Sequence, residues 1–286
     1  MRFLFSRPKE ETEFRQPSTE PAQPFMHCIV HSLSETGPVR EHNEDHLLSY
    51  FLTDDRQQLL CVVADGMGGH HAGEIASQIA CETMLKYTLQ NRNDPPGNLL
   101  SNAIQAAHGA IRKAGNENPS QRGMGTTATA VMIKDNTLSF AHVGDSRLYH
   151  FSAGSLRQLS KDHTLVNQMY ENGEISLAQR DTHAMRNVLL QALGTVNAIV
   201  PQTAVVPIAL QVTDKLLLCS DGLYDVFSDA QLQNLMRMND PALILECFRT
   251  IAMERRASDN FTAVLISFSD DIVSTTPITK EHNIMS

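Results

Sequence analysis

Aspartates recur in this sequence at the ends of apolar runs. LLCVVAD ends at Asp65, LSFAHVGD ends at Asp145, and KLLLCSD ends at Asp221. A fourth aspartate, Asp259, lies in the SDN that precedes FTAVLISF. Taken singly, each is typical of a turn, because aspartate is a common turn residue. The recurrence favours a shared role, because strands of one sheet would bring these carboxylates together at its edge.

Carboxylates gathered at one edge predict a site for hard divalent cations. Without a cation they repel one another, and each shifts toward its protonated form. Aspartate-rich, all-oxygen sites suit Mg²⁺ or Mn²⁺. Gly66, directly after Asp65, leaves a backbone carbonyl accessible as a further ligand. Two such ions about 3.5–4 Å apart activate a water and clamp the oxygens of a displacement at phosphorus.

A candidate phosphate-binding residue lies just before another pair of acids. Arg40 is close in sequence to Glu44 and Asp45, which precede the apolar run HLLSYFL. A guanidinium fork can hold a phosphate through two hydrogen bonds. A surface salt bridge is the alternative interpretation of Arg40, and the two are equally plausible from its position alone.

The elements that must position these residues come in blocks. Strands are expected at HCIVHSL, HLLSYFL and QLLCVVAD, and helices over 72–90 and about 98–113. Two hairpins follow, turning at 135–136 and 153–154, then the strand KLLLCSD, helices near 229–236 and 241–255, and the strand FTAVLISF. Strands do not alternate one by one with helices. The order therefore predicts an α+β fold, a sandwich of antiparallel sheets with pairs of helices outside.

Composition narrows the class of protein. The 286 residues carry a net charge of -9, which argues against general binding to nucleic acid or to anionic membranes. No run approaches the roughly 20 apolar residues of a membrane helix, and the five cysteines form no CxxC pair. We expect a cytoplasmic protein with a leader at 1–25, one catalytic domain at 26–269 and a polar tail at 270–286.

Eight motifs of the chain occur in an order that identifies a family. They are RxxNED (40–45), VADGMGGHxxGE (63–74), GMGTTAT (123–129), HVGDSRLY (142–149), KDHTLV (161–166), RNVLLQALG (186–194), LLLCSDGLYD (216–225) and ASDNFTAVL (257–265). On these motifs the chain resembles bacterial members of the protein phosphatase 2C (PPM) family, the metal-dependent serine/threonine protein phosphatases, over about residues 26–268. The family fold is a sandwich of two antiparallel β-sheets flanked by pairs of α-helices, in agreement with the block order.

The resemblance implies a role for each candidate residue. Asp65 would bridge two metal ions, Gly66 would bind one of them through its carbonyl, and Asp221 and Asp259 would complete the other. Asp145 would help to hold a third, weaker ion. Glu44 and Asp45 would act mainly through bound waters or contacts to the ligands, and Arg40 would bind the substrate phosphate. The ions would be Mn²⁺ or Mg²⁺, two or three in number.

The resemblance also implies a reaction and partners. The reaction would be hydrolysis of phosphoserine and phosphothreonine in proteins by direct attack of water. The expected partners are phosphorylated proteins and a bacterial Hanks-type kinase with its targets, and we expect a monomer. The blocks RLYHFSAGSLRQLSKDH and LLLCSDGLYD also resemble phosphatases of type VI secretion control.

Two features of the family pattern stay open. Met67 stands where animal relatives carry a histidine proposed as the general acid, so the proton must come from a metal-bound water or from His70, His71 or His163. The simpler interpretation of each histidine is a structural one. Residues 161–193, which include Gly173, correspond to the flap beside the active site. An ordinary helix and loop without a role in specificity is the alternative there.

Two other functions are compatible with parts of the sequence. A catalytically silent phosphatase-like sensor or binding module would keep the fold, although such proteins usually lose metal carboxylates. GDSRL also resembles the GDSL-type serine esterases, with Ser146 as nucleophile. That family needs a DxxH pair, which this chain lacks. A cysteine phosphatase is excluded because no cysteine begins a CxxxxxR motif.

Overall fold

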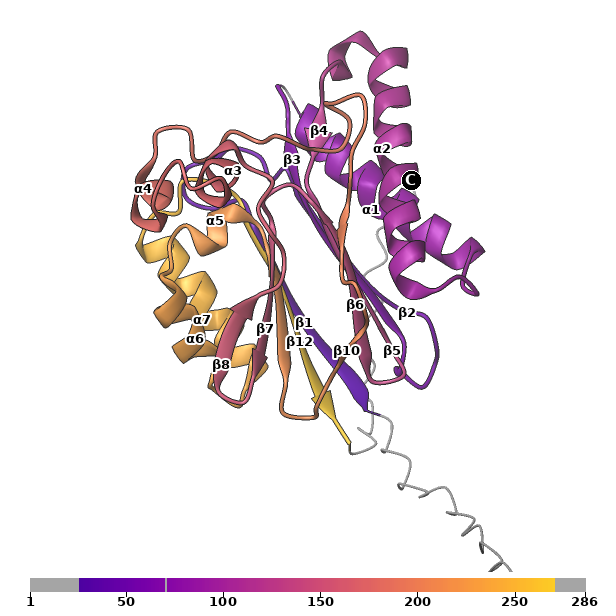
Figure 1. Ribbon diagram of the computed structural model, residues 1–286, viewed down its shortest axis with the longest axis vertical. Coiled ribbons are helices and arrows are strands. Elements are labelled where there is room, and N and C mark those ends of the chain that lie inside the picture. Colours follow the sequence, from indigo (N-terminus) through magenta and orange to yellow (C-terminus); the bar gives the residue numbers. More distant parts are fainter. Residues whose placement is uncertain (1–25, 70, 271–286) are drawn as a thin grey trace, which may run out of the picture.

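The computed structural model describes residues 26–69 and 71–270. The expected leader, His70 and nearly all of the expected tail lie outside the described residues. Two antiparallel sheets form the centre of the molecule (Figure 1). Sheet A has the order β1 (His27–Glu35), β12 (Phe261–Ser269), β11 (Lys215–Cys219), β7 (Arg147–Ser152) and β8 (Ser155–Gln158).

Sheet B lies against sheet A and contains the remaining strands. Its order is β10 (Ile208–Ala209), β6 (Thr137–Val143), β5 (Ala128–Lys134), β3 (Leu59–Met67) and β2 (Asp45–Phe51). Two short strands join it at the sides, β4 (Gly125–Thr126) beside β3 and β9 (Gln202–Thr203) beside β6.

Helices cover the outer faces of both sheets, which confirms the predicted fold class. Sheet B is covered by α1 (Ala72–Gln90) and α2 (Pro96–Glu117), and sheet A by α6 (Asp229–Met236) and α7 (Pro241–Glu254). Shorter helices lie at the end of the sandwich that is uppermost in Figure 1, namely α3 (Leu165–Glu171), α4 (Leu177–Thr182) and α5 (Asp221–Tyr224). A 3-10 turn, η1 (Pro119–Gln121), follows α2.

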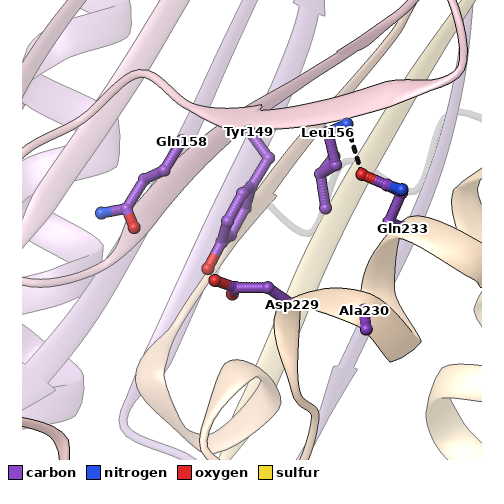
Figure 2. A pocket seen from close by; sticks show the side chains of 6 residues that line it. All are labelled: Tyr149, Leu156, Gln158, Asp229, Ala230 and Gln233. Atoms are coloured by element: carbon purple, nitrogen blue, oxygen red, sulfur yellow. Dashed lines mark hydrogen bonds between the residues drawn. The ribbon is translucent and has the colours of Figure 1, made fainter. Parts of the chain in front are cut away.

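Three apolar clusters hold the layers together. One fills the space between the two sheets, and one lies on each outer face beneath the helices. On sheet A the helices leave a pocket of about 310 Å³ between the β7–β8 hairpin and α6, lined by Tyr149, Gln158 and Asp229 among others (Figure 2). On sheet B, α1 packs closely because its buried positions carry small side chains such as Ala76 and Ala80.

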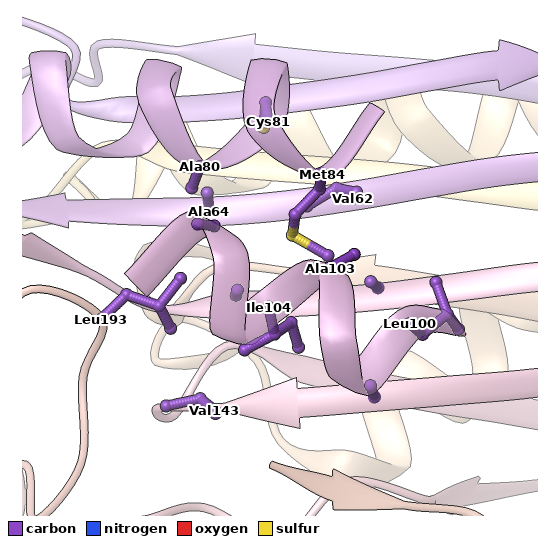
Figure 3. Close-up of a cluster of buried hydrophobic side chains, with 14 of the residues drawn as sticks. Val62, Ala64, Ala80, Cys81, Met84, Leu100, Ala103, Ile104, Val143 and Leu193 are labelled. Atoms are coloured by element: carbon purple, nitrogen blue, oxygen red, sulfur yellow. The ribbon is translucent and has the colours of Figure 1, made fainter. Parts of the chain in front are cut away.

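The packing of α2 on sheet B is shown in Figure 3. Leu100, Ala103 and Ile104 are fully buried on one face of the helix. Leu193, from the far end of the expected flap, is fully buried in the same cluster. Burial of this apolar face supplies most of the free energy that holds α2 in place.

The predicted hairpins form where the sequence places their turns. Asp135 and Asn136 have φ of 51° and 55°, the left-handed conformation of a two-residue turn that matches the twist of the strands. Ala153 and Gly154 adopt similar values, 49° and 78°. Because the strands are antiparallel, their alternate ends lie at the same edge, and this is what gathers the acids.

Most predicted elements are confirmed, and the differences concern short or extended ones. The second helix spans Pro96–Glu117 rather than about 98–113, because Pro96 and Gly97 at its start do not prevent helix formation in the first turn. The two-residue strands and α3 to α5 were not expected, since elements this short show no periodicity. Within residues 26–69 and 71–270, none of the helices combines the length and apolar character that a membrane span requires.

Candidate metal centre and active site

Strands from both sheets bring the predicted acids to one end of the sandwich. On sheet B, Asp45 begins β2 and lies opposite Asp65 near the end of β3. On sheet A, Asp221 follows β11, and Asp259 comes just before β12. Asp145 lies in the link from β6 of sheet B to β7 of sheet A. The sequence interpretation placed these strands in one sheet, whereas the structure divides them between two sheets whose acid-bearing strand ends meet at the same end of the sandwich.

The surroundings of Asp65 and Asp221 favour a bound cation most clearly. Burial raises the pKa of Asp65 well above its ordinary value, and four carboxylates, Asp45, Asp221, Asp145 and Asp259, raise it further. Burial and the neighbouring carboxylates likewise raise the pKa of Asp221 well above its ordinary range. The buried Oδ1 of Asp221 has no hydrogen-bond partner among the described residues. A divalent cation would satisfy both groups, so the donor set fits a hard metal ion.

The ionised forms of Asp45 and Asp145 are also disfavoured. Burial raises the pKa of Asp45 to about 6, although hydrogen bonds oppose the shift, and the Ser220 hydroxyl donates one to its Oδ2 at 2.7 Å. Burial and the nearby Asp162 raise the pKa of Asp145 to about 7, with Arg147 opposing them. Both carboxyls therefore lie in surroundings that favour added positive charge.

The acids converge without closing around an ion. Across the described part of the chain, no three side chains of His, Cys, Asp or Glu are grouped so that they hold a metal ion. One of these acids, Asp259, has an arginine as its partner, because its Oδ2 accepts a hydrogen bond from Arg40 Nη2 at 2.6 Å. The surface salt bridge considered for Arg40 is thus present, and its partner is one of the predicted metal ligands.

Gly66 is required by the backbone around it. A Cβ atom at Gly66 would collide with the carbonyl oxygens of Gly73 and Glu44. The Gly66 N–H donates to the Glu44 carbonyl at 3.1 Å, so the loop before β2 and the end of β3 are joined directly. Burial raises the pKa of Glu44, while the Gly73 N–H and Arg40 lower it.

Three supporting residues were not assigned roles from the sequence. The Asn260 side chain accepts from the Glu44 N–H and donates to the carbonyls of Thr36 and His42, each at 2.8 Å. It therefore fixes the loop that carries Arg40. The sequence motifs could have indicated all three residues, because Asn260 lies in the SDN motif and the other two, Thr126 and Thr127, lie in GMGTTAT.

Thr126 and Thr127 fix the backbone of Asp65. The Thr126 hydroxyl donates to the Asp65 carbonyl at 2.9 Å, and the Thr127 hydroxyl accepts from the Asp65 N–H at 2.9 Å. The Thr127 N–H also donates to the Asp65 carbonyl, again at 2.9 Å. The position of the Asp65 main chain is thus set by three hydrogen bonds from one neighbouring segment.

The candidate proton donors differ in their surroundings. His163 Nδ1 accepts a hydrogen bond from the Gly144 N–H at 3.2 Å, and burial lowers the pKa of His163. This favours the structural interpretation of His163. His71 is 53% exposed, and its ring lies 4.1 Å from that of His42. Met67 ends β3, where its thioether offers no proton.

Ser146 is not placed as a nucleophile. Its side chain is fully buried, and its hydroxyl shares a 2.6 Å hydrogen bond with that of Thr127. A serine esterase needs an accessible hydroxyl beside a base, so this geometry argues against the esterase alternative. The pocket of Figure 2 also lies away from the acids, on the outer face of sheet A.

The expected flap contains α3 and α4 and contacts the rest of the molecule at several points. Thr164 pairs with Leu189 within the flap, and Leu193 pairs with Thr126 of β4 at its end. Between them, Arg186 Nη2 donates to Asp225 Oδ2 at 3.1 Å. Asp225 directly follows α5, whose first residue is Asp221. The flap is therefore in contact with the element that carries a predicted metal ligand.

Comparisons with known proteins agree with this arrangement. The family model for Protein phosphatase 2C matches residues 39–258. The serine/threonine phosphatase Stp of Listeria welshimeri is 34% identical over 241 residues, covering 82% of this chain and 93% of that protein. The catalytic domain of the serine/threonine protein phosphatase PstP, solved with two manganese ions, has a TM-score of 0.74 at 29% identity, covering 85% of this chain and 99% of that one.

A further similar structure is that of a regulatory phosphatase. PppA of Pseudomonas aeruginosa, a key regulatory component of the type VI secretion system there, has a TM-score of 0.67 at 28% identity, with coverage of 85% of this chain and 98% of that one.

Proposed function

This chain belongs to the protein phosphatase 2C family and is a serine/threonine protein phosphatase, and we propose that Asp65, Gly66, Asp221 and Asp259 hold its divalent cations. The observation that supports this assignment most is the buried Oδ1 of Asp221, which has no hydrogen-bond partner among the described residues although other carboxylates surround it. Asp145 would contribute to a third, weaker site.

The cations are proposed to be Mn²⁺ or Mg²⁺, two or three in number. All-oxygen donors favour both ions, and the related PstP structure contains two manganese ions. When bound, such ions polarise a water molecule and the phosphoryl oxygens. The protein's own part is to keep Asp65 fixed through Thr126 and Thr127 and to hold the remaining carboxylates within reach.

Arg40 is proposed to bind the phosphate of the substrate. Its pair with Asp259 uses Nη2, and the side chain is 49% exposed, so a phosphate can approach the guanidinium group. Before a phosphate binds, Asp259 orients Arg40. Glu44 and Asp45 are proposed to act through waters or through contacts to the ligands, since Asp45 is buried against Ser220 and Glu44 faces Gly73.

The substrates are proposed to be proteins phosphorylated on serine or threonine by a bacterial Hanks-type kinase, including the kinase itself. The similarity to PppA supports type VI secretion control as the setting. We propose further that the enzyme acts in the cytoplasm as a monomer, with residues 26–269 as one catalytic domain and 161–193 as its flap.

An acid-to-amide exchange at Asp221 tests the metal assignment. A change at a residue that merely supports a metal ligand costs about tenfold to a hundredfold, so Asp221→Asn is expected to lower kcat/KM by more than about a hundredfold. Activity is measured with a phosphothreonine peptide and with p-nitrophenyl phosphate in Mn²⁺, and Mn²⁺ binding by calorimetry.

Asp229→Asn provides a matched control for this experiment. Asp229, like Asp221, is the first residue of a helix that follows a serine, but it is exposed and lies on α6. Its exchange should leave turnover unchanged. Equal activity of Asp221→Asn and wild type, or full activity in excess chelator, would contradict the proposal. A wild type that binds Mn²⁺ without turnover would instead favour the silent binding module.

A further inference from the structure

Helix α2 holds the chain that follows the flap through one face. Three of its side chains are spaced three and four residues apart, so they lie on the same side of the helix. Each contacts the backbone of 194–199. Gln105 Nε2 donates to the Ile199 carbonyl at 2.9 Å, His108 Nδ1 accepts from the Gly194 N–H at 3.1 Å, and Arg112 Nη1 donates to the Asn197 carbonyl at 2.9 Å.

His108 differs from Gln105 and Arg112 because its residue is buried, whereas theirs are exposed. The His108 residue is 6% exposed, and burial lowers its pKa. Because Nδ1 accepts from the Gly194 N–H, the proton of the neutral imidazole is on Nε2, which has no hydrogen-bond partner among the described residues. The Gly194 N–H is half-buried, and losing its acceptor costs free energy, so His108 helps to fix Gly194.

The backbone conformation and the close packing at Gly194 both require glycine. It has a φ of +86°, a conformation that favours glycine. A Cβ atom there would lie 2.6 Å from the Met124 carbonyl oxygen and would also collide with the Ile111 side chain of α2. The backbone at Gly194 thus touches both α2 and the residue just before β4.

The segment then continues directly to the metal-binding end of β3. Leu193 exchanges two backbone hydrogen bonds with Thr126, at 2.8 and 3.1 Å. Thr126 pairs with Gly66 across β3 and β4, and its hydroxyl donates to the Asp65 carbonyl. Leu193 itself is buried beside Ile104 of α2 (Figure 3).

We propose that His108 is a positioning residue for cation binding, acting through Gly194, Leu193 and Thr126 on the backbone of Asp65 and Gly66. The strand β4 has two residues, and so short a ladder is weak without support from the side. His108 supplies that support from α2. This inference rests on the proposed function, because it assumes that Asp65 and Gly66 bind the cations.

A matched pair of substitutions isolates the hydrogen bond. In His108→Asn the amide Oδ1 occupies the place of Nδ1 and can accept from Gly194. In His108→Leu a side chain of similar size has no acceptor. Loss of one hydrogen bond predicts a threefold to tenfold weaker Mn²⁺ affinity for His108→Leu, on the order set by a single such bond, whereas His108→Asn should stay within about twofold of wild type.

Two measurements read the effect without relying on turnover. Calorimetry gives the Mn²⁺ affinity. Hydrogen exchange of the metal-free protein should show faster exchange at 124–126 and 192–195 in His108→Leu and wild-type rates in His108→Asn. If His108→Leu does not fold, His108→Ala removes the acceptor with a small side chain and carries the same expectation.

Controls separate positioning from general stability. Arg112→Ala removes an exposed contact on the same helix face and should leave Mn²⁺ affinity unchanged. A His108→Leu protein that melts at a lower temperature but binds Mn²⁺ as tightly as wild type would overturn the inference and leave the proposed function intact. A wild type that binds no Mn²⁺, or an Asp221→Asn variant that binds it normally, would overturn the proposed function instead.

Discussion

Two of the arginine–aspartate pairs near the acidic edge are built differently. Arg147 Nε and Nη2 both donate to Asp162, with the shortest contact at 2.7 Å, and the side chains are 16% and 10% exposed. The remaining Nη1 donates to the Tyr149 hydroxyl at 3.0 Å, and the guanidinium carbon lies 3.6 Å from the centre of the Tyr224 ring. Arg40 and Asp259 meet through one contact and are 49% and 34% exposed.

The difference separates a structural pair from an exchangeable one. Every side of the Arg147 guanidinium is occupied, so removing it leaves buried groups without partners. The Arg40 pair gains little net free energy, because water screens it and both side chains have alternatives. A phosphate can therefore compete for Arg40, and a cation can compete for Asp259, at small cost.

The largest expected effect comes from breaking the buried pair. Arg147→Met keeps much of the side-chain volume but leaves the Asp162 charge buried, which predicts a loss of about 3–5 kcal/mol in the free energy of unfolding. Urea denaturation followed by circular dichroism measures it. Adding Asp162→Leu should restore part of the loss, because the unpaired charge is then gone. A loss below about 1 kcal/mol would mean that this pair is as exchangeable as the exposed one.

A second prediction concerns the two buried acids Asp45 and Asp145. An unfolded aspartate releases its proton near its ordinary pKa of 3.8, whereas burial raises the pKa of Asp45 to about 6 and that of Asp145 to about 7. Between these values the folded protein binds more protons than the unfolded chain. The stability of the metal-free protein should therefore fall as pH rises from about 4 to about 7 and change little from these groups above that.

Melting curves check this prediction. We expect the metal-free protein to melt at a clearly higher temperature at pH 5 than at pH 8, because the two shifts together correspond to about 4 kcal/mol or less. Mn²⁺ should reduce the difference, because it favours the charged carboxylates. Asp145→Asn should flatten the metal-free profile. Identical pH profiles with and without Mn²⁺ would show that these carboxyls do not control the stability of the site.

The sequence predicted the parts of this comparison that depend on regular patterns. The helix over 72–90 follows from its periodicity, and its bounds are confirmed. The gathering of Asp65, Asp145 and Asp221 follows from acids that end apolar runs, once the strands are antiparallel. These features are local or follow from simple topology, so one sequence is enough to predict them.

Contacts between distant segments could not be predicted in the same way. Arg40 and Asp259 are 219 positions apart, and nothing in either motif indicates that the two candidates satisfy each other. His108 appears as one histidine on a helix face, which is most often structural. Its contact with Gly194 depends on how α2 packs on sheet B, and packing has no periodic signal along the chain.

The smallest effect on stability is expected at the exposed pair, and it tests the comparison most directly. Arg40→Ala should change the free energy of unfolding by about 1 kcal/mol or less. Its activity should nevertheless fall, because a hydrogen bond to a charged group contributes about 1.5–3 kcal/mol, which corresponds to roughly a tenfold to hundredfold loss of kcat/KM with a phosphothreonine peptide.

Arg249→Ala supplies the control, since Arg249 forms an equally exposed pair with Glu246 on α7 and should leave kcat/KM unchanged. If Arg40→Ala retained full kcat/KM, its pair with Asp259 would be only another surface salt bridge. If Arg40→Ala instead unfolded as readily as Arg147→Met, the pair would be structural. Only a stable protein with low activity fits an Arg40 that pairs with Asp259 in the free enzyme and binds the phosphate instead when the substrate is present.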